Sequence, residues 1–304
     1  MCSARPGTPS EVRPGVLSVN KPAGATSFTV VRRLRELTGA RRVGHAGTLD
    51  PLATGVLPVL FESATRLADF AHQLPKTYVA DIHLGFRTAT DDAEAEPEAV
   101  ADPSRVGEAE VTSALSSFVG SIQQEPPAFS AVKVAGERSY KRARQGDLER
   151  PRARQVEVYS VDLISFQGGT RPVASIRVSC GSGTYLRSLA RDLGERLEVG
   201  GYLGKLVRTA YGGMRIENSP SLEELDSPAT VEALLLSPEV LIPNMERVRL
   251  NVEQEAQVRQ GRAVRVMPEP GPGPLRAHDA SGRLVALGHA DPLRRTFVPE
   301  KVLN

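Results

Sequence analysis

Apolar residues recur along this chain with two different periods, and their order constrains the fold more than any other feature. A period of two over 78–84 and 173–180 predicts strands with one buried face. A helical period follows Ser27, which can cap a helix, and ends at Gly39; a second occupies 184–197. Because the two types do not alternate regularly, the pattern favours an α+β fold over a doubly wound sheet.

The sequence pattern changes near residue 246, and this change predicts two domains. A helix capped by Asn251 and short strand-like pieces indicate a small β-rich module there. We expect a disordered lead-in over 1–14, a main domain over 15–245 and the module over 246–304. Further predicted elements of the main domain are a strand over 16–19, a helix over 110–119 and a strand over 156–166.

Cysteine and apolar content exclude several classes of protein. No apolar stretch approaches the ~20 residues of a membrane span, and the N-terminus lacks the apolar core of a secretory signal. Cys2 and Cys180, with five histidines, support neither a disulfide framework nor a metal site. We expect a cytoplasmic protein without a metal, with Cys180 buried as a small apolar residue.

The net charge of +2 conceals an uneven distribution. Eight acidic residues fall within 91–110, and basic residues cluster over 32–42 and 136–155. Such runs are either solvated faces or a polarised surface with one side suited to a polyanion. Of 38 basic residues 32 are arginine, a preference that phosphate binding or a GC-rich genome would each explain.

The stretch GHAGTLDPLATGVLPV, residues 44–59, is the most informative for chemistry. Its glycines and prolines place Asp50 in a turn, where an Asp-Pro pair has a purely structural explanation. His45 lies in the same loop, and Leu49 and Leu52 would surround the carboxylate with apolar groups. That environment is typical of a carboxylate that serves as a nucleophile or base.

A second candidate is the Gly-rich turn CGSGTYLRS, residues 180–188. If Ser182 or Thr184 caps the following helix, Arg187 lies in the first turn, where the helix dipole disfavours a cation. A carboxylate from elsewhere would explain this placement, and Asp50 is a candidate; a purely structural ion pair is the alternative. Tyr185 and Tyr78 are possible stacking platforms, although Tyr78 also fits a core tyrosine.

Six blocks in order show that the chain resembles the bacterial TruB-type tRNA pseudouridine synthases over nearly its whole length. The blocks are LSVNKPAGATSF, RRVGHAGTLDPLATGVLPV, KTYVADIHLGFRTATDD, QQEPPAFSAVKVAGERSYKRARQG, SCGSGTYLRSLARDLGE and GYLGKLVRT. The resemblance implies a mixed, mainly antiparallel sheet flanked by helices and a PUA-like β-barrel module. It also implies isomerisation of uridine 55 in the tRNA T loop to pseudouridine, without a cofactor, by a protein that we expect to be monomeric.

The resemblance assigns roles by position. Asp50 corresponds to the catalytic aspartate, and His45 to the histidine that helps to hold the site of the flipped-out uridine open. Tyr78 corresponds to the tyrosine that stacks on the target base and is linked to loss of the C5 proton. Tyr185 would contact the base, Arg187 would pair with Asp50, and Leu206 would line the uracil pocket.

Departures from the family pattern leave these residues intact and concern RNA contacts instead. They are Ala46, Ala89, Ala95, Gly181, Ser182, Tyr202 and Val207. Two other functions stay open: an RNA-folding chaperone or binding module with residual synthase activity, and a carboxylate-dependent nucleosidase. The nucleosidase is weaker because no second acid occupies an equally specific loop.

Overall fold

The computed structural model describes residues 12–130, 133–134, 137–138, 150–267 and 271–303. Most of the basic stretch 136–155, including Lys141, Arg142 and Arg144, lies outside the described residues, as do Cys2 and nearly all of the lead-in. No helix in the described part of the chain is long and apolar enough to cross a membrane.

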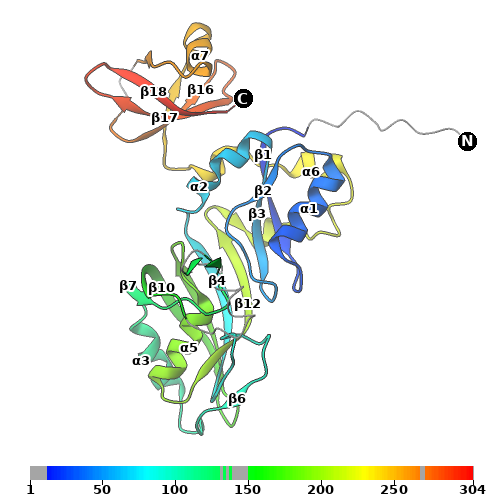
Figure 1. Cartoon of the computed structure of the whole chain (residues 1–304), viewed down its shortest axis with the longest axis vertical. Coiled ribbons are helices and arrows are strands. Elements are labelled where there is room, and N and C mark those ends of the chain that lie inside the picture. Colours follow the sequence, from blue (N-terminus) through cyan, green and yellow to red (C-terminus); the bar gives the residue numbers. More distant parts are fainter. Residues whose placement is uncertain (1–11, 131–132, 135–136, 139–149, 268–270, 304) are drawn as a thin grey trace, which may run out of the picture.

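A nine-stranded mixed sheet forms the larger part of the molecule (Figure 1). Its main path runs β1-β3-β12-β4-β11-β10-β7; β2 pairs with β3 and β13 with β12. All its pairings are antiparallel except that between β3 and β12. The bounds are β1 Gly15–Lys21, β2 Val43–His45, β3 Thr54–Phe61, β4 Lys76–Leu84, β7 Gly120–Gln124, β10 Arg154–Gln167, β11 Val173–Cys180, β12 Gly201–Tyr211 and β13 Met214–Arg215.

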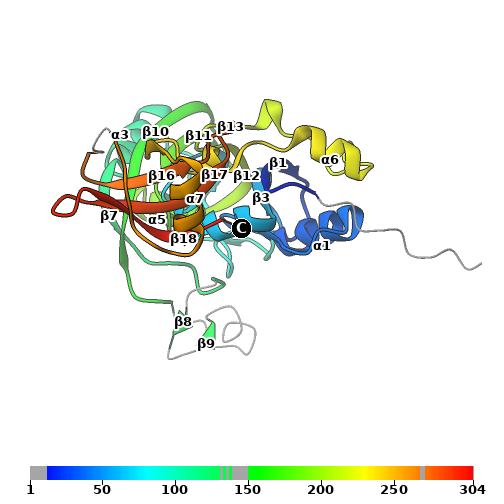
Figure 2. The same ribbon diagram turned by 90° about the horizontal axis from the view of Figure 1, so that it is seen from above.

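Helices and short strands cover or flank this sheet. The helices are α1 Ser27–Thr38, η1 Glu62–Leu67, α2 Ala68–Ala71, α3 Glu108–Ser116, α5 Leu186–Arg196, η2 Ile216–Asn218, α6 Pro228–Leu234 and η3 Pro238–Leu241. Two hairpins of two-residue strands complete this part: β5 Phe86–Arg87 with β6 Glu98–Ala99, and β8 Lys133–Val134 with β9 Glu137–Arg138. The second hairpin lies to one side of both large sheets (Figure 2).

Apolar cores pack on both faces of the large sheet at its β1–β3 end. On one face, Val30 and Leu34 of α1 share a core with Leu189 and Leu193 of α5 and with strand residues such as Ile82. On the other face, residues of β1, β3, η1 and α2 form a second core with Tyr211. The strand β4 is alternately buried and half-buried, as its period of two predicts.

A five-stranded sheet forms the C-terminal part, in the order β14-β16-β17-β18-β15. It has its own core, and Leu287 and Leu303 also join the second core of the large sheet. The mixed sheet with helices and this curled C-terminal sheet confirm the predicted α+β fold with a PUA-like module. The elements are β14 Glu246–Arg249, α7 Val252–Arg259, β15 Val264–Arg265, β16 Pro274–His278, β17 Leu284–Asp291 and β18 Thr296–Val302.

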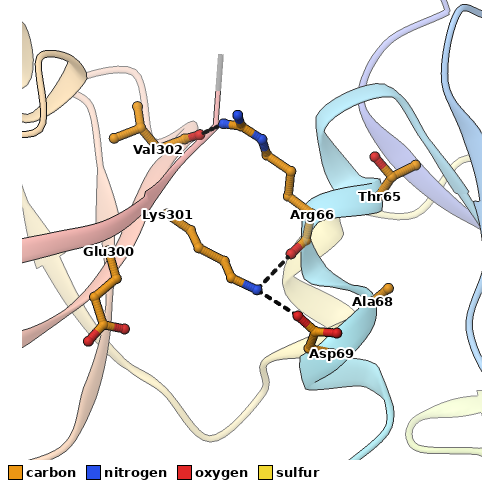
Figure 3. A pocket seen from close by; sticks show the side chains of 7 residues that line it. All are labelled: Thr65, Arg66, Ala68, Asp69, Glu300, Lys301 and Val302. Atoms are coloured by element: carbon orange, nitrogen blue, oxygen red, sulfur yellow. Dashed lines mark hydrogen bonds and ion pairs between the residues drawn. The ribbon is translucent and has the colours of Figure 1, made fainter.

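Polar contacts supplement the apolar contact between the two sheets (Figure 3). Lys301 Nζ lies 2.9 Å from Asp69 Oδ2, and Arg66 donates to the carbonyl of Val302. These side chains line an open cavity of about 550 Å³ whose walls contain none of the predicted site residues. Glu239 of η3 adds an ion pair at 2.8 Å with Arg276 of β16.

Two sequence-based expectations are corrected. His45 does not lie in the loop of Asp50, because it is the last residue of β2. The cap of α1 is Thr26, whose side chain accepts from the Thr29 N–H, whereas Ser27 is the first helical residue.

Candidate functional site

The loop between β2 and β3 carries Asp50 and is tied down at several points. The Ser27 hydroxyl accepts from the Leu49 N–H at 3.0 Å and donates to the Leu49 carbonyl at 3.2 Å. The Pro51 carbonyl accepts from the Gly24 N–H at 2.8 Å. Gly47 has a φ of +70°, and a Cβ there would lie 2.7 Å from the Tyr211 ring. These contacts give the loop that carries the carboxylate one defined conformation.

Asp50 and Arg187 form the ion pair that the sequence predicted as one alternative. Arg187 Nη2 lies 2.9 Å from Asp50 Oδ2; the Asp50 side chain is 36% exposed and that of Arg187 only 6%. Arg187 is in the first turn of α5, but the predicted cap is wrong, since the N-cap is Tyr185 and makes no side-chain cap bond. The side chain of Gln124 instead accepts from the Tyr185 N–H at 2.7 Å.

A second carboxylate holds the other side of the same guanidinium. Asp92 Oδ2 lies 3.5 Å from Arg187 Nη1, and its side chain is 2% exposed. Burial raises the pKa of Asp92, while hydrogen bonds from Thr90 and from the Glu94 N–H oppose that rise. Asp50 and the buried Asp92 therefore share one guanidinium.

The neighbouring Asp91 extends this network away from Asp50. Its carboxylate lies 3.1 Å from Arg191 and 3.4 Å from Arg150, and its backbone has a φ of +58°. Asp91 and Asp92 begin the acidic run 91–110, yet both are buried. This run is thus not uniformly a solvated face, and its first two members are structural acids that sequence reasoning missed.

Tyr78 lies on β4 at the centre of the large sheet, opposite Arg208 of β12. It is only 9% exposed, and burial raises the pKa of its hydroxyl, against the effect of the Arg208 guanidinium. Leu206, 6% exposed, lies on β12 opposite Ala80, so Tyr78 and Leu206 occupy neighbouring strands of one core. Tyr78 is therefore a neutral phenol at pH 7.

Arg208 is a buried cation that sequence reasoning missed. Its Nε donates to the Val56 carbonyl at 2.6 Å and its Nη2 to the Gly47 carbonyl at 2.8 Å. Its guanidinium carbon lies 5.0 Å from the centre of the Tyr211 ring. The residue thus connects β12 to β3 and to the loop that bears Asp50.

Two buried lysines lie close to the same elements. Lys21 Nζ donates to the carbonyls of Ala25 and Pro51, at 2.7 and 3.3 Å. Lys76 Nζ donates to the Ser182 hydroxyl at 2.7 Å. Burial lowers the pKa of each ammonium to about 8.

The remaining predicted residues surround this centre. His45 ends β2 half-buried, and burial lowers its pKa. The Tyr185 ring lies 5.0 Å from the guanidinium carbon of Arg154. Among the described residues, no hydrogen bond or ion pair joins His45, Tyr185 or Leu206 directly to Asp50. Cys180 is buried as predicted, and burial raises its thiol pKa to about 11.

Comparisons of the whole chain with known proteins give a consistent result. Residues 35–186 match the model of the TruB family pseudouridylate synthase (N terminal domain). A protein of Synechococcus elongatus named tRNA pseudouridine synthase B is 42% identical, over 90% of this chain and 93% of its own. A protein of the same name from Thermobifida fusca (strain YX) is 43% identical over the same shares. A crystal structure of a Cbf5-Nop10-Gar1 complex contains a chain with a TM-score of 0.71 and 26% identity, covering 95% of this chain and 85% of that one.

Proposed function

Because the chain belongs to the TruB family of pseudouridylate synthases, we propose that it converts uridine 55 of the tRNA T loop to pseudouridine, with Asp50 as the nucleophile. The observation that carries this proposal is the 2.9 Å ion pair between Asp50 and Arg187. It leaves one carboxylate partly accessible within an otherwise buried network.

The reaction needs a group that stabilises the broken C1′–N1 linkage while the detached base is retained and turned over. The C1′–N1 bond breaks, the base rotates, and a C1′–C5 bond forms; C5 loses a proton and N1 gains one. Asp50 attacks either C1′ or C6 and so divides a difficult step into easier ones. Arg187 orients one oxygen of the Asp50 carboxylate, because the other side of its guanidinium is held by Asp92.

The uridine must leave its stack before it can react, which costs a few kcal/mol. Tyr78 and Leu206 supply the uracil pocket in this proposal, and Tyr185 and His45 border it. As a neutral phenol, Tyr78 stacks on the base and donates a hydrogen bond; it accepts the C5 proton only if it passes its own proton on.

Exposed arginines support RNA as the substrate. Arg152 is exposed, two residues before Arg154, which donates to the Gly183 carbonyl and lies over the Tyr185 ring. In the C-terminal sheet, Arg247, Arg249, Arg262 and Arg265 are exposed and make no ion pair within the described residues. We assign the first to the T arm and the second group to the acceptor end of tRNA.

The test is pseudouridine formation in a T-arm RNA by wild type and Asp50→Asn, measured by nucleoside analysis. We expect Asp50→Asn to lose activity by at least about 10³-fold, as expected for a lost nucleophile, and to retain RNA affinity. Asp162→Asn, an exposed aspartate on β10, is the matched control and should be fully active. Near-normal turnover by Asp50→Asn would refute the assignment.

The same experiment separates the alternatives. A nucleosidase would release uracil, whereas an isomerase retains it in the RNA. A chaperone function would survive in Asp50→Asn as an effect on tRNA folding without modification.

A further inference from the structure

Phe28, on the outer face of α1, is the aromatic residue that the proposed function leaves unexplained. Its exposed fraction is 70%. All eight phenylalanines of the chain lie among the described residues, and the other seven are buried or half-buried. A single exposed apolar side chain is ordinary in itself, so the surroundings of Phe28 must decide whether it has a role.

Phe28 and two arginines form a stripe along one side of α1, with Phe28 at its N-terminal end. Arg32 and Arg35 follow at i+4 and i+7, within one side of the helix and over about 10 Å of its length. Both arginines are exposed, and neither forms an ion pair with any residue that the structure describes. Val30, Val31 and Leu34 supply the buried face, so the stripe is not needed for packing.

The N-terminal end of this stripe adjoins the loop of Asp50. Ser27, the residue before Phe28, is hydrogen-bonded to both backbone groups of Leu49, which directly precedes Asp50. The segment before the helix is also tied to Pro51 through Gly24 and Lys21. Figure 1 shows α1 beside β2 and β3, the strands on either side of this loop.

We propose that Phe28 is a base-stacking residue of the RNA interface. Its ring stacks on an unpaired nucleobase next to the extruded uridine, and Arg32 and Arg35 bind the phosphates that lead away from it. This inference rests on the proposed function. A nucleic acid fits the stripe because it offers a flat apolar surface and regularly spaced negative charge together.

The first test uses the absence of tryptophan from the chain. Phe28→Trp, combined with Asp50→Asn to prevent turnover, carries one indole at the proposed contact. We expect its fluorescence to be quenched as T-arm RNA is added, with a midpoint equal to the Kd from filter binding. Val119→Trp in the same background is the control, since Val119 is 47% exposed after α3, away from the loop. Unchanged emission at saturating RNA would overturn the proposal.

The second test measures affinity and turnover of Phe28→Ala and Phe28→Tyr. We expect Phe28→Ala to raise the Kd at least about fivefold, the lower end for one lost base–aromatic stack, and Phe28→Tyr to retain wild-type affinity. Leu234→Ala, on the exposed side of α6, should change nothing.

Wild-type turnover distinguishes the two possible failures. If wild type forms pseudouridine and Phe28→Ala binds RNA as tightly as wild type, the stacking proposal is wrong and the proposed function stands. If wild type neither binds nor modifies the RNA, both fail. If Phe28→Ala weakened binding to a protein and left the affinity for RNA unchanged, the proposal would also be overturned.

Discussion

At the scale of residues, three buried cations lie close to the candidate site and donate mainly to neutral groups. Lys21, Lys76 and Arg208 are each at most 5% exposed and donate to backbone carbonyls or to a hydroxyl. For the lysines, loss of hydration outweighs these bonds, and their pKa values fall to about 8. Burial of these charges therefore lowers the free energy of unfolding and keeps positive charge next to the site.

That cost predicts a pH dependence of stability. Between about pH 8 and 10.5 the unfolded chain keeps Lys76 protonated while the folded chain releases the proton, so the free energy of unfolding rises with pH. Lys76→Met removes this contribution. We expect the wild type to gain up to about 3 kcal/mol over the variant across that range.

Urea unfolding of both proteins at several pH values from 7 to 10.5 measures the difference. Lys21 and the buried Tyr78 and Tyr211 titrate in both proteins, so their effects largely cancel in the comparison. A difference that is constant with pH would contradict the prediction.

Sequence reasoning located only part of this residue-scale arrangement. The pairing of Arg187 with Asp50 could be anticipated, because a cation in the first turn of a helix needs a carboxylate. Asp91 and Asp92 could not, because they begin an acidic run typical of a solvated face and are buried only through tertiary contacts. Arg208 was missed for the same reason: an arginine in a strand is expected to face water. The functional roles of all these residues stay predictions.

At the scale of elements, helix α1 holds the loop of Asp50 in place, although it contributes none of the predicted site residues. Thr26 caps the helix, and Ser27 binds the loop of Asp50 through two hydrogen bonds. The two neighbouring hydroxyls therefore have separate tasks, one internal to the helix and one directed to the loop.

Alanine substitutions separate these tasks. Thr26→Ala and Ser27→Ala should each lower the free energy of unfolding by about 1 kcal/mol, for a lost cap and for buried bonds to the backbone. Only Ser27→Ala should lower kcat, by about tenfold or more, because it frees the carboxylate loop. Thermal unfolding and T-arm turnover test the pair; equal kcat values would refute the difference.

Several helices and strands were predicted from the sequence, whereas the internal strands β3 and β12 were missed. The predicted helix over 110–119 lies at Glu108–Ser116, and the strand over 156–166 at Arg154–Gln167. The sequence of β12 shows no regular alternation of apolar and polar residues. A bulge between Leu203 and Lys205 shifts its period, and Arg208 occupies an inward position. At Gly204 a Cβ would lie 2.2 Å from His83, so this bulge depends on a contact that the local sequence does not show.

At the scale of the whole molecule, the C-terminal sheet is attached mainly by apolar contact. Leu287 is 1% exposed within the second core of the large sheet. The Lys301–Asp69 pair at the same boundary is open to water, with Asp69 84% exposed. The predicted division near residue 245 remains a prediction, because these cores connect the two sheets.

Two substitutions should therefore differ in effect. Leu287→Ala should cost about 2–4 kcal/mol, from lost burial and a remaining cavity. Lys301→Ala should cost less than about 1 kcal/mol, as exposed ion pairs do. Chemical unfolding checks both, and a larger loss for Lys301→Ala would show that the polar contact dominates.

The parallel contact between β3 and β12 joins only Thr54 with Val207 and Gly55 with Arg208. Asp50 lies on the β3 side of this short seam, whereas Tyr78 and Arg187 lie on the β12 side. The proposed nucleophile and its partners thus belong to two half-sites, which these two residue pairs and the bonds of Arg208 join within the sheet. At Gly55, with a φ of +102°, a Cβ would lie 2.2 Å from the Arg208 carbonyl oxygen. A side chain at that position would force the halves apart and misalign the proposed catalytic pair, which it does not contact.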